Sequence, residues 1–246
     1  MTSAERQANY YTRTASNYDG QHLACDPEHD LAIALIAGLA KHCGAQSILD
    51  VGAGTGRAVA LLGRYLPGVR VVGIEPVDAL RDIAASKGIG ADQLLAGSGD
   101  ALPFPDGSFD LVIESGVLHH VAEPDAIVAE MLRVARLGVA LSDSNKYGQG
   151  RWPVRFAKAI IARLGLWHWF IWLQTKGRMW KWSEGDGLFY SYSVFDNLAQ
   201  IARKFPQIQL TNTGPLRGFN LRRDAAQICL IALAEAAVPE REGAGR

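Results

Sequence analysis

The feature that most constrains the fold is the stretch from Ser47 to Arg57, which reads S-I-L-D-V-G-A-G-T-G-R. Its first part, Ile48 to Val51, is apolar apart from Asp50 and is typical of a buried parallel strand. A glycine-rich turn follows, and the residues after Arg57 read as the start of a helix. These three elements form the first unit of a doubly wound α/β domain, whose ligand binds beyond the carboxyl end of the strand.

The three glycines of the turn, Gly52, Gly54 and Gly56, follow a G-x-G-x-G spacing. A dinucleotide fingerprint would need its third glycine at Arg57, so the spacing argues against that kind of site. Glycine suits such a loop because a side chain would block close approach of the backbone to a ligand. A tight turn without a ligand gives the same pattern, so the downstream motifs decide the function.

A second acidic residue ends the next expected strand, Val69 to Glu75, and Pro76 follows it. Glu75 lies about 20 positions beyond the first glycine, where this architecture places a carboxylate that accepts from both hydroxyls of a ribose. A solvated charge at a strand end is the alternative. The remaining expected strands lie at 92–99, 111–115, 137–142, 207–213 and 227–234, and the expected helices at 27–42, 77–87 and 194–205.

The stretch from Leu102 to Val121, L-P-F-P-D-G-S-F-D-L-V-I-E-S-G-V-L-H-H-V, resembles a large subfamily of class I S-adenosylmethionine (SAM) methyltransferases almost continuously. The glycine turn, with Asp50 before it, resembles the first motif of the same enzymes, and the resemblance runs from about residue 45 to residue 136. It implies a Rossmann-like doubly wound sheet of seven strands in the order 3-2-1-4-5-7-6, with helices on both faces. It also implies SAM as the cofactor and methylation as the reaction.

The resemblance assigns cofactor contacts to positions of this chain. In the family, an acidic residue after the third strand binds the adenine amino group, and Asp100 matches it. The full expected set is Tyr18, Asp50, Gly52, Ala53, Gly54, Gly56, Glu75, Pro76, Asp100, Ala101, Leu102, Glu114 and Ser115. The chain departs from the family before the fifth strand, where the usual Lys-Pro-Gly-Gly turn is replaced by R-V-A-R-L-G-V, and the shape of this lead-in stays open.

Candidates for catalysis follow the fourth and fifth strands. His119 and His120 lie near the expected position of the methyl group, and transfer to oxygen requires a base, so either could remove the proton. A structural hydrogen bond is the alternative role. Asn145 could orient an acceptor. The remaining histidines, His22, His29, His42 and His168, are scattered, which predicts no metal site.

An insertion at 146–193, expected to be helical, follows the fifth strand. Between Asp143 and Glu184 it has eight basic residues, no acidic residue and all six tryptophans of the chain. It suits an element at a membrane surface, a lid over an apolar or aromatic acceptor, or helices whose tryptophans pack on the core. Its position above the methyl group favours the lid. The expected acceptor contacts are Tyr11, Trp152, Trp167, Trp169 and Tyr190.

We therefore expect one methyltransferase domain over 1–239, with an N-terminal lid at 1–26, and a disordered tail at 240–246. Twenty-five basic residues balance 25 acidic ones, which argues against a nucleic-acid partner. Cys25, Cys43 and Cys229 form no sequence pair, and no signal sequence precedes them, which favours the cytoplasm.

The favoured function is SAM-dependent methyl transfer to an oxygen, in preference to a nitrogen, of an apolar or aromatic small molecule. One alternative is methylation of a lipid-linked or saccharide acceptor at a membrane surface, through peripheral contact of the insertion. Another is a non-catalytic SAM-binding regulatory protein. The sequence predicts neither the acceptor nor the oligomeric state.

Overall fold

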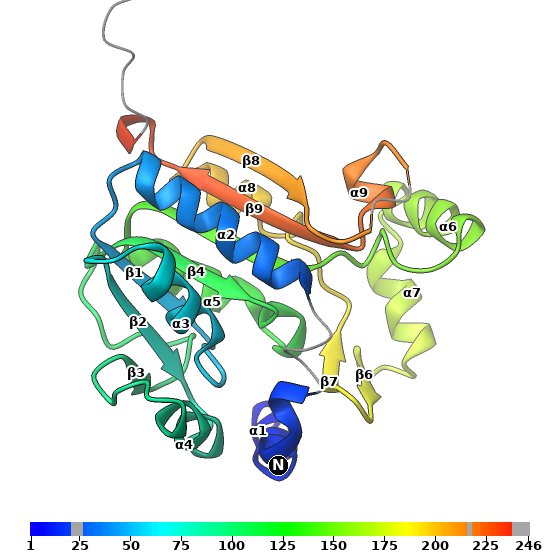
Figure 1. Ribbon diagram of the computed structural model, residues 1–246. Coiled ribbons are helices and arrows are strands. Elements are labelled where there is room, and N and C mark those ends of the chain that lie inside the picture. Colours follow the sequence, from blue (N-terminus) through cyan, green and yellow to red (C-terminus); the bar gives the residue numbers. More distant parts are fainter. Residues whose placement is uncertain (21–26, 216–217, 238–246) are drawn as a thin grey trace, which may run out of the picture.

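The computed structural model describes residues 1–20, 27–215 and 218–237, and it shows a sheet covered by helices on both faces (Figure 1). Cys25, His22, the end of the predicted lid and the predicted tail lie outside these residues. The strands of the sheet are β1 (Ser47–Val51), β2 (Arg70–Glu75), β3 (Leu94–Ala96), β4 (Phe109–Ser115), β5 (Ala135–Ser144), β8 (Gln207–Asn212) and β9 (Gln227–Leu233). The longer helices around it are α2 (Pro27–His42), α3 (Arg57–Tyr65), α4 (Asp78–Ser86) and α5 (Pro124–Val134). Shorter ones are η1 (Ala15–Asn17), η3 (Leu118–His120), α8 (Leu198–Ala202), α9 (Leu221–Asp224) and η4 (Glu235–Ala237).

The strand order is β3-β2-β1-β4-β5-β9-β8, and β9 runs antiparallel to both of its neighbours. Since β6 and β7 pair outside this sheet, the order confirms the predicted Rossmann-like arrangement. The other neighbouring pairs, from β3 to β5, are parallel, so their carboxyl ends meet at one edge. A ligand of the domain is expected at that edge.

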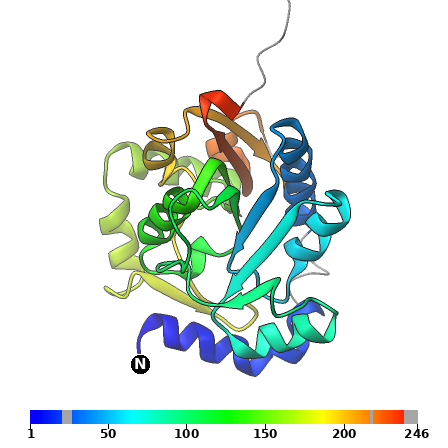
Figure 2. The same cartoon turned by 90° about the vertical axis from the view of Figure 1, so that its left-hand side faces the viewer.

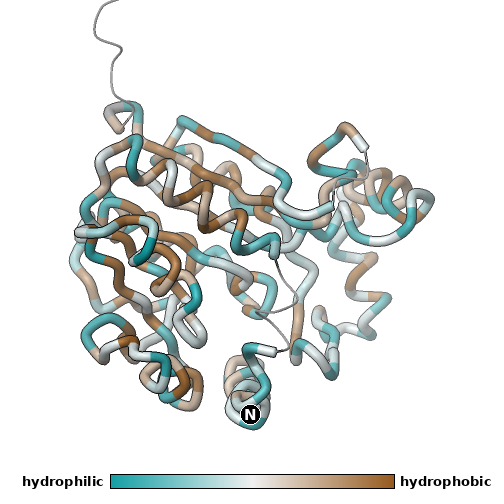
Figure 3. Tube along the Cα trace, in the orientation of Figure 1, coloured by the Kyte–Doolittle hydropathy of each residue, from teal (hydrophilic) through white to brown (hydrophobic). Residues whose placement is uncertain are grey.

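The central strands divide their side chains between two cores, because successive residues of a strand point to opposite faces. Ile48 and Ile113 pack in the core under α2 and α3, whereas Leu49 and Val112 pack in the core under α5 and α8. Burial on both faces explains the nearly continuous apolar runs in the sequence. Hydrophobic colour runs along these strands and along α2 (Figure 3).

The lead-in to the fifth strand is direct. Helix α5 ends at Val134 and β5 begins at Ala135, so the strand starts earlier than the predicted 137. The start of this strand is held by Asp110, which is 3% exposed, accepts from the Gln46 N–H at 2.7 Å and pairs with Arg136. Thus a buried carboxylate and an arginine fix the segment where the family has its turn.

The insertion consists of two helices, α6 (Trp152–Arg163) and α7 (Trp167–Gln174), followed by a hairpin of β6 (Trp180–Ser183) and β7 (Gly187–Tyr190). The prediction of a helical insertion is therefore wrong for its second half, where W-K-W-S and G-L-F-Y flank the turn E-G-D-G. Short runs with aromatic residues on both sides of a glycine turn favour a hairpin. Among the described residues, no helix has the length and apolar character needed to cross a membrane.

The hairpin is fixed by the N-terminal helix α1 (Ser3–Thr14), which lies against β7 below the sheet edge (Figures 1 and 2). Gln7 accepts from the Leu188 N–H at 2.7 Å and donates to the Asp186 carbonyl at 3.2 Å. Tyr10 donates its hydroxyl to the Glu184 carbonyl at 2.9 Å. The two segments that the sequence assigned to lids thus form one connected layer.

Two glycines test the packing of this architecture. A Cβ on Gly148 would lie 1.7 Å from the Ala225 carbonyl oxygen, so Gly148→Ala must push two chain segments apart. We expect a loss of about 1–3 kcal/mol in the free energy of unfolding. Gly38 is exposed within α2 and has no atom within 4 Å of its Cβ position, so Gly38→Ala should stabilise by up to about 1 kcal/mol. Urea unfolding measures both changes. An unchanged free energy of unfolding for Gly148→Ala would contradict the close contact.

Candidate functional site

A cavity of about 320 Å³ lies at the carboxyl ends of β1 and β4, where a doubly wound domain binds its ligand. Five of the predicted cofactor residues line it, namely Tyr18, Asp50, Gly52, Ala53 and Ser115. Tyr11, His119 and His120 of the other predicted sets line it as well. Residues from segments far apart in the sequence thus meet in one cavity.

Two buried carboxylates support the glycine turn beside this cavity. Glu75 is 5% exposed and accepts from the Gly54 and Val77 N–H groups, both at 2.9 Å. Burial raises the pKa of Glu75, and these two hydrogen bonds act against that rise. Burial, followed by the charge of Glu75, raises the pKa of Asp50 to about 7. Because a carboxylate oxygen can accept more than one hydrogen bond, ligand hydroxyl or ammonium donors here would relieve both groups, which fits the predicted cofactor.

The N-terminal segment covers the glycine turn. Gly54 has φ +55°, and a Cβ there would lie 3.0 Å from the Tyr18 hydroxyl, so both its conformation and its space require glycine. Asp19 accepts from the Thr55 hydroxyl at 2.7 Å and pairs with Lys87. These contacts hold the segment at the place where the sequence predicts a lid.

Three predicted cofactor contacts have structural roles instead. A Cβ on Gly56 would lie 2.1 Å from Ile89, so this glycine permits close packing of α3. Glu114 is fully buried and accepts from the Val117 N–H at 3.1 Å, outside the cavity. Leu102 is buried in the core, and its N–H donates to Glu130 at 2.8 Å. In this structure the three residues thus serve packing and backbone support, and none of them lines the cavity.

Three further predicted contacts lie outside the cavity wall but remain accessible. Pro76, Asp100 and Ala101 are exposed and follow the carboxyl ends of β2 and β3. Their contacts with the adenosine part of the cofactor remain predictions.

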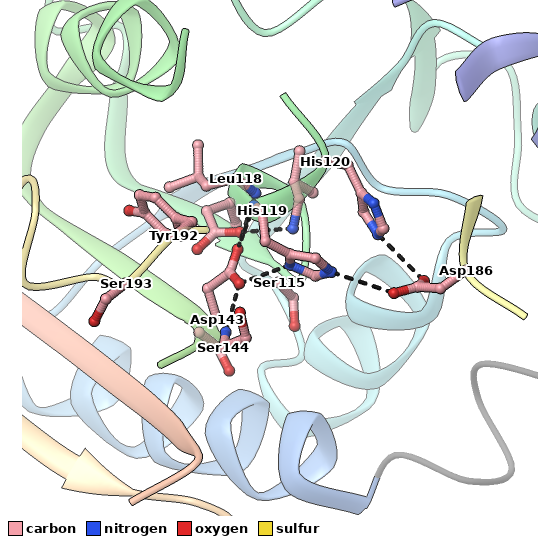
Figure 4. Close-up of polar contacts among 12 residues, drawn as sticks. Ser115, Leu118, His119, His120, Asp143, Ser144, Asp186, Tyr192 and Ser193 are labelled. Atoms are coloured by element: carbon pink, nitrogen blue, oxygen red, sulfur yellow. Dashed lines mark hydrogen bonds and ion pairs between the residues drawn. The ribbon is translucent and has the colours of Figure 1, made fainter. Parts of the chain in front are cut away.

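A cluster of histidines and carboxylates forms the floor of the cavity (Figure 4). His119 Nδ1 lies 2.7 Å from Asp143 Oδ1, and Asp143 is fully buried at the end of β5. Asp186, in the hairpin turn, faces both rings: its oxygens lie 3.7 Å from His119 Nε2 and 3.3 Å from His120 Nε2. The cluster therefore joins the sheet edge to the insertion.

The charges of this cluster oppose the predicted general-base role of His119. Burial lowers the pKa of His119, but Asp143 and Asp186 outweigh it and raise that pKa to about 10. Such a histidine carries a proton near neutral pH and cannot take one from an acceptor. The structure thus assigns His119 to charge pairing with Asp143 and Asp186.

Asn145 does not orient a ligand in this structure. It is fully buried, and its amide donates to the carbonyls of Arg222 and Ala225, both at 2.8 Å. Its oxygen accepts from the Ser193 hydroxyl at 2.9 Å. The predicted role is wrong because these bonds use the side chain to join the end of β5 to two loops.

A second cavity, of about 730 Å³, lies under the insertion. Trp167 and Tyr190 line it, as the lid interpretation expects of acceptor contacts, together with Phe170, Trp180 and Phe189. Trp152 and Trp169 are 60% and 63% exposed and do not line it, so the structure does not bring these two predicted acceptor contacts to the cavity. Three residues line both cavities: His119, Asp186 and Gln227.

Sequence reasoning missed His29, Asp143 and Asp186. His29 Nδ1 lies 3.0 Å from the Ser115 hydroxyl, and burial lowers the pKa of this histidine. A signal for His29 was present, because it shares a helix face with Ile33 and Ile36 and is therefore directed inward. Asp186 had only a weak signal, its glycine-flanked turn, because its partners lie 66 and 67 positions earlier.

Comparison with known proteins agrees with this geometry. Residues 49–142 match the sequence model of a family described as "Methyltransferase domain". An uncharacterized methyltransferase of Mycobacterium avium is 40% identical over 104 residues, which are 42% of this chain and 40% of the relative. One from Schizosaccharomyces pombe is 35% identical over 102 residues, covering 37% and 36% of the two chains. The chain thus spans about two fifths of the length of the curated relatives that it matches.

Solved structures show the same fold over more of the chain. A SAM-dependent methyltransferase of Thermotoga maritima, described as a possible histamine N-methyltransferase, superposes with a TM-score of 0.54 and 18% identity, and covers 92% of this chain and 99% of its own. At this identity the likeness concerns the fold alone. Together these comparisons show that residues 49–142 match a methyltransferase domain by sequence, and that the fold around them is shared with a solved SAM-dependent methyltransferase.

Proposed function

We propose that the protein transfers a methyl group from SAM to an oxygen of an apolar or aromatic small molecule. The observation that carries the proposal is the meeting of two cavities at His119, Asp186 and Gln227. One cavity lies at the cofactor edge of the sheet, and the other has aromatic walls. SAM supplies an electrophilic methyl group on a sulfonium, so the protein has mainly to align an acceptor and exclude water.

The aromatic wall supports an acceptor that stacks on a fixed surface. Trp167 donates its indole N–H to the Ser191 hydroxyl at 3.2 Å and packs on Tyr147 with ring centres 5.2 Å apart. The lining of this cavity also includes polar side chains, among them Lys146, Lys158 and Lys181. Small-molecule sites typically combine apolar and aromatic walls with polar groups that orient the ligand. A second cavity of this kind also favours an enzyme over the alternative of a non-catalytic SAM-binding regulator.

The polar side chains where the two cavities meet support oxygen over nitrogen as the acceptor atom. An acceptor hydroxyl must lose a proton during transfer, and charged or titratable groups beside it assist that loss. Two carboxylates and two imidazoles lie at this junction, and Asp143 fixes one of the rings. Of these groups, His119 and Asp186 also line the aromatic cavity.

The first prediction for this site concerns the cofactor. Glu75→Gln keeps the size of the side chain but replaces one acceptor of the pair that holds Gly54 and Val77 by a donor. In the variant, a buried backbone N–H of the glycine turn loses its acceptor, and the turn that faces the cofactor is no longer held. We therefore expect the free energy of SAM binding to weaken by about 1–3 kcal/mol. Asp78→Asn is the matched control, since that carboxylate is 86% exposed and lies three residues away. Calorimetric titration with SAM compares the two, and equal affinities would remove Glu75 from the site.

The second prediction concerns the acceptor wall and uses two tryptophans of α7. Trp167→Ala removes part of the wall of the second cavity. Trp169→Ala removes an exposed ring that does not line this cavity. With a panel of phenols as acceptors and release of the demethylated cofactor as readout, Trp167→Ala should lower kcat/KM about tenfold or more, roughly one aromatic contact. Trp169→Ala should leave it unchanged. Equal kinetics for the two variants would contradict the proposed acceptor cavity.

A second candidate function is favoured by the outer face of the insertion. Its exposed apolar side chains on α6, α7 and the turn between them include Trp152, Phe156, Ile160, Leu164, Leu166, Trp169, Trp172 and Leu173. Arg151, Arg163 and Lys176 are exposed nearby, and hydrophobic segments of both helices lie at the rim of the molecule (Figure 3). Aromatic and aliphatic side chains beside basic ones suit an anionic membrane surface. On this basis the acceptor would be lipid-linked and presented by the membrane.

Vesicle binding tests this candidate. The protein should co-sediment with phosphatidylglycerol vesicles at low salt and less at high salt, because charge attraction is screened. The pair Trp169→Ala and Leu173→Ala should reduce binding, since these side chains are 63% and 68% exposed on α7. Leu31→Ala, an exposed leucine on α2, is the control. If the intact protein stays in solution at low salt, the membrane candidate fails.

A further inference from the structure

We propose that His119, His120 and Asp186 form a binding site for one divalent transition-metal ion. Their candidate ligand atoms, one per residue, all lie within 4.8 Å of one another. They come from η3 after β4 and from the β6–β7 turn of the insertion (Figure 4). The sequence predicted no metal site, because the carboxylate that completes this one lies far away along the chain.

The orientation of both rings is the first argument. His120 Nδ1 lies 2.7 Å from the Leu188 carbonyl, which can only accept, so this nitrogen carries the proton. His119 Nδ1 lies 2.7 Å from Asp143 Oδ1 and donates in the same way. Both Nε2 atoms are thereby directed at Asp186, and an ion that binds here would displace the proton that His119 Nε2 otherwise carries. Metal-binding histidines typically donate their other ring nitrogen to a carbonyl or carboxylate in this manner.

The Gln7 amide does not disturb this assignment. Its nitrogen lies 3.2 Å from His120 Nδ1 but also 3.2 Å from the Asp186 carbonyl oxygen, which can accept from it. The oxygen of this amide accepts from the Leu188 N–H. Gln7 thus holds the hairpin turn so that the Asp186 side chain stays opposite the two rings.

The spacing of the atoms is the second argument. The oxygens of Asp186 lie 3.3 Å and 3.7 Å from the two Nε2 atoms. Charge-assisted hydrogen bonds between such groups are shorter, about 2.7–2.9 Å. Neighbouring ligands around an ion with bonds of about 2.1 Å lie roughly 3.0–3.4 Å apart, as tetrahedral and octahedral geometry require. The two distances involve different oxygens of Asp186, and with one ligand atom per residue the set lies within 4.8 Å, so the rings and the carboxylate would have to move closer together around an ion.

The donor set defines the class of ion. Two imidazoles and one carboxylate suit Zn²⁺, Fe²⁺, Co²⁺ or Ni²⁺, whereas Ca²⁺ and Mg²⁺ prefer oxygen ligands alone. Three protein ligands leave coordination positions open, as in catalytic sites. Because His119 and Asp186 line both cavities, these positions face the space between cofactor and acceptor.

An ion at this place also deepens the proposed reaction, and this consequence rests on the proposed function. A positive charge beside an acceptor hydroxyl lowers its pKa, so that its proton can leave to water. The oxygen then forms the bond to the methyl carbon while the sulfur–carbon bond breaks and the sulfur keeps the electron pair. No histidine has to serve as the base.

The experiment titrates untagged, chelator-treated protein with Co²⁺ and follows the visible absorption of the bound ion. We expect one ion per chain for the intact protein. Asp186→Asn and His120→Gln should each weaken binding by at least tenfold. His42→Gln is the matched control, because this histidine is exposed at the end of α2. Circular dichroism and SAM calorimetry on the same samples show whether the fold and the cofactor site are intact.

The outcomes separate the metal site from the proposed function. Absence of saturable Co²⁺ binding by the intact protein, or equal binding by Asp186→Asn, would overturn the site. Binding that is lost in both site variants and kept in His42→Gln would establish it. Failure of the intact protein to bind SAM would count against the proposed function alone, since the metal titration contains no SAM.

Discussion

The buried carboxylate of Asp143 fixes the part of the molecule on which the candidate site depends. It lies at the end of β5, accepts from the Leu118 N–H at 2.9 Å and binds His119 Nδ1 at 2.7 Å. A fully buried carboxylate is costly unless it is paired and hydrogen-bonded, so the turn after β4 must supply these donors. This requirement fixes the position of His119. Because Nδ1 is bound to Asp143, the opposite nitrogen, Nε2, faces the insertion.

The insertion and the N-terminal helix complete the site together. Gln7 and Tyr10 hold the hairpin turn by hydrogen bonds to its backbone, and the turn presents Asp186 to the two histidines. On the other side, Arg155 of α6 forms a buried pair with Asp224 of α9 at 3.1 Å. The insertion is thus attached at both ends, which makes the second cavity a preformed space between fixed walls.

The six tryptophans of the insertion lie in three different surroundings. Trp167 and Trp180 line the inner cavity, Trp152, Trp169 and Trp172 are exposed on α6 and α7, and Trp182 packs edge-to-face on Tyr10. Exposed apolar side chains that lie together on one face commonly mark an interaction surface. The lid and membrane interpretations therefore do not compete for the same side chains, and one segment can serve an apolar acceptor inside and a surface outside.

The sequence by itself determined the sheet and its cofactor edge. Strand patterns, the glycine turn and Glu75 are local signals, and the resemblance supplied the strand order, so Asp50, Gly52, Ala53 and Ser115 were found at the cavity. Tertiary structure decided the rest, because side-chain contacts across long separations leave no local pattern. The sequence suggests Asn145 as an acceptor ligand, but its side chain is used in hydrogen bonds to two other segments of the chain. Asp186 reads as a turn residue but meets His119 and His120 only after the hairpin folds back. Which tryptophans face inward was likewise decided by packing, since α7 is apolar around its whole circumference and its sequence specifies no buried face.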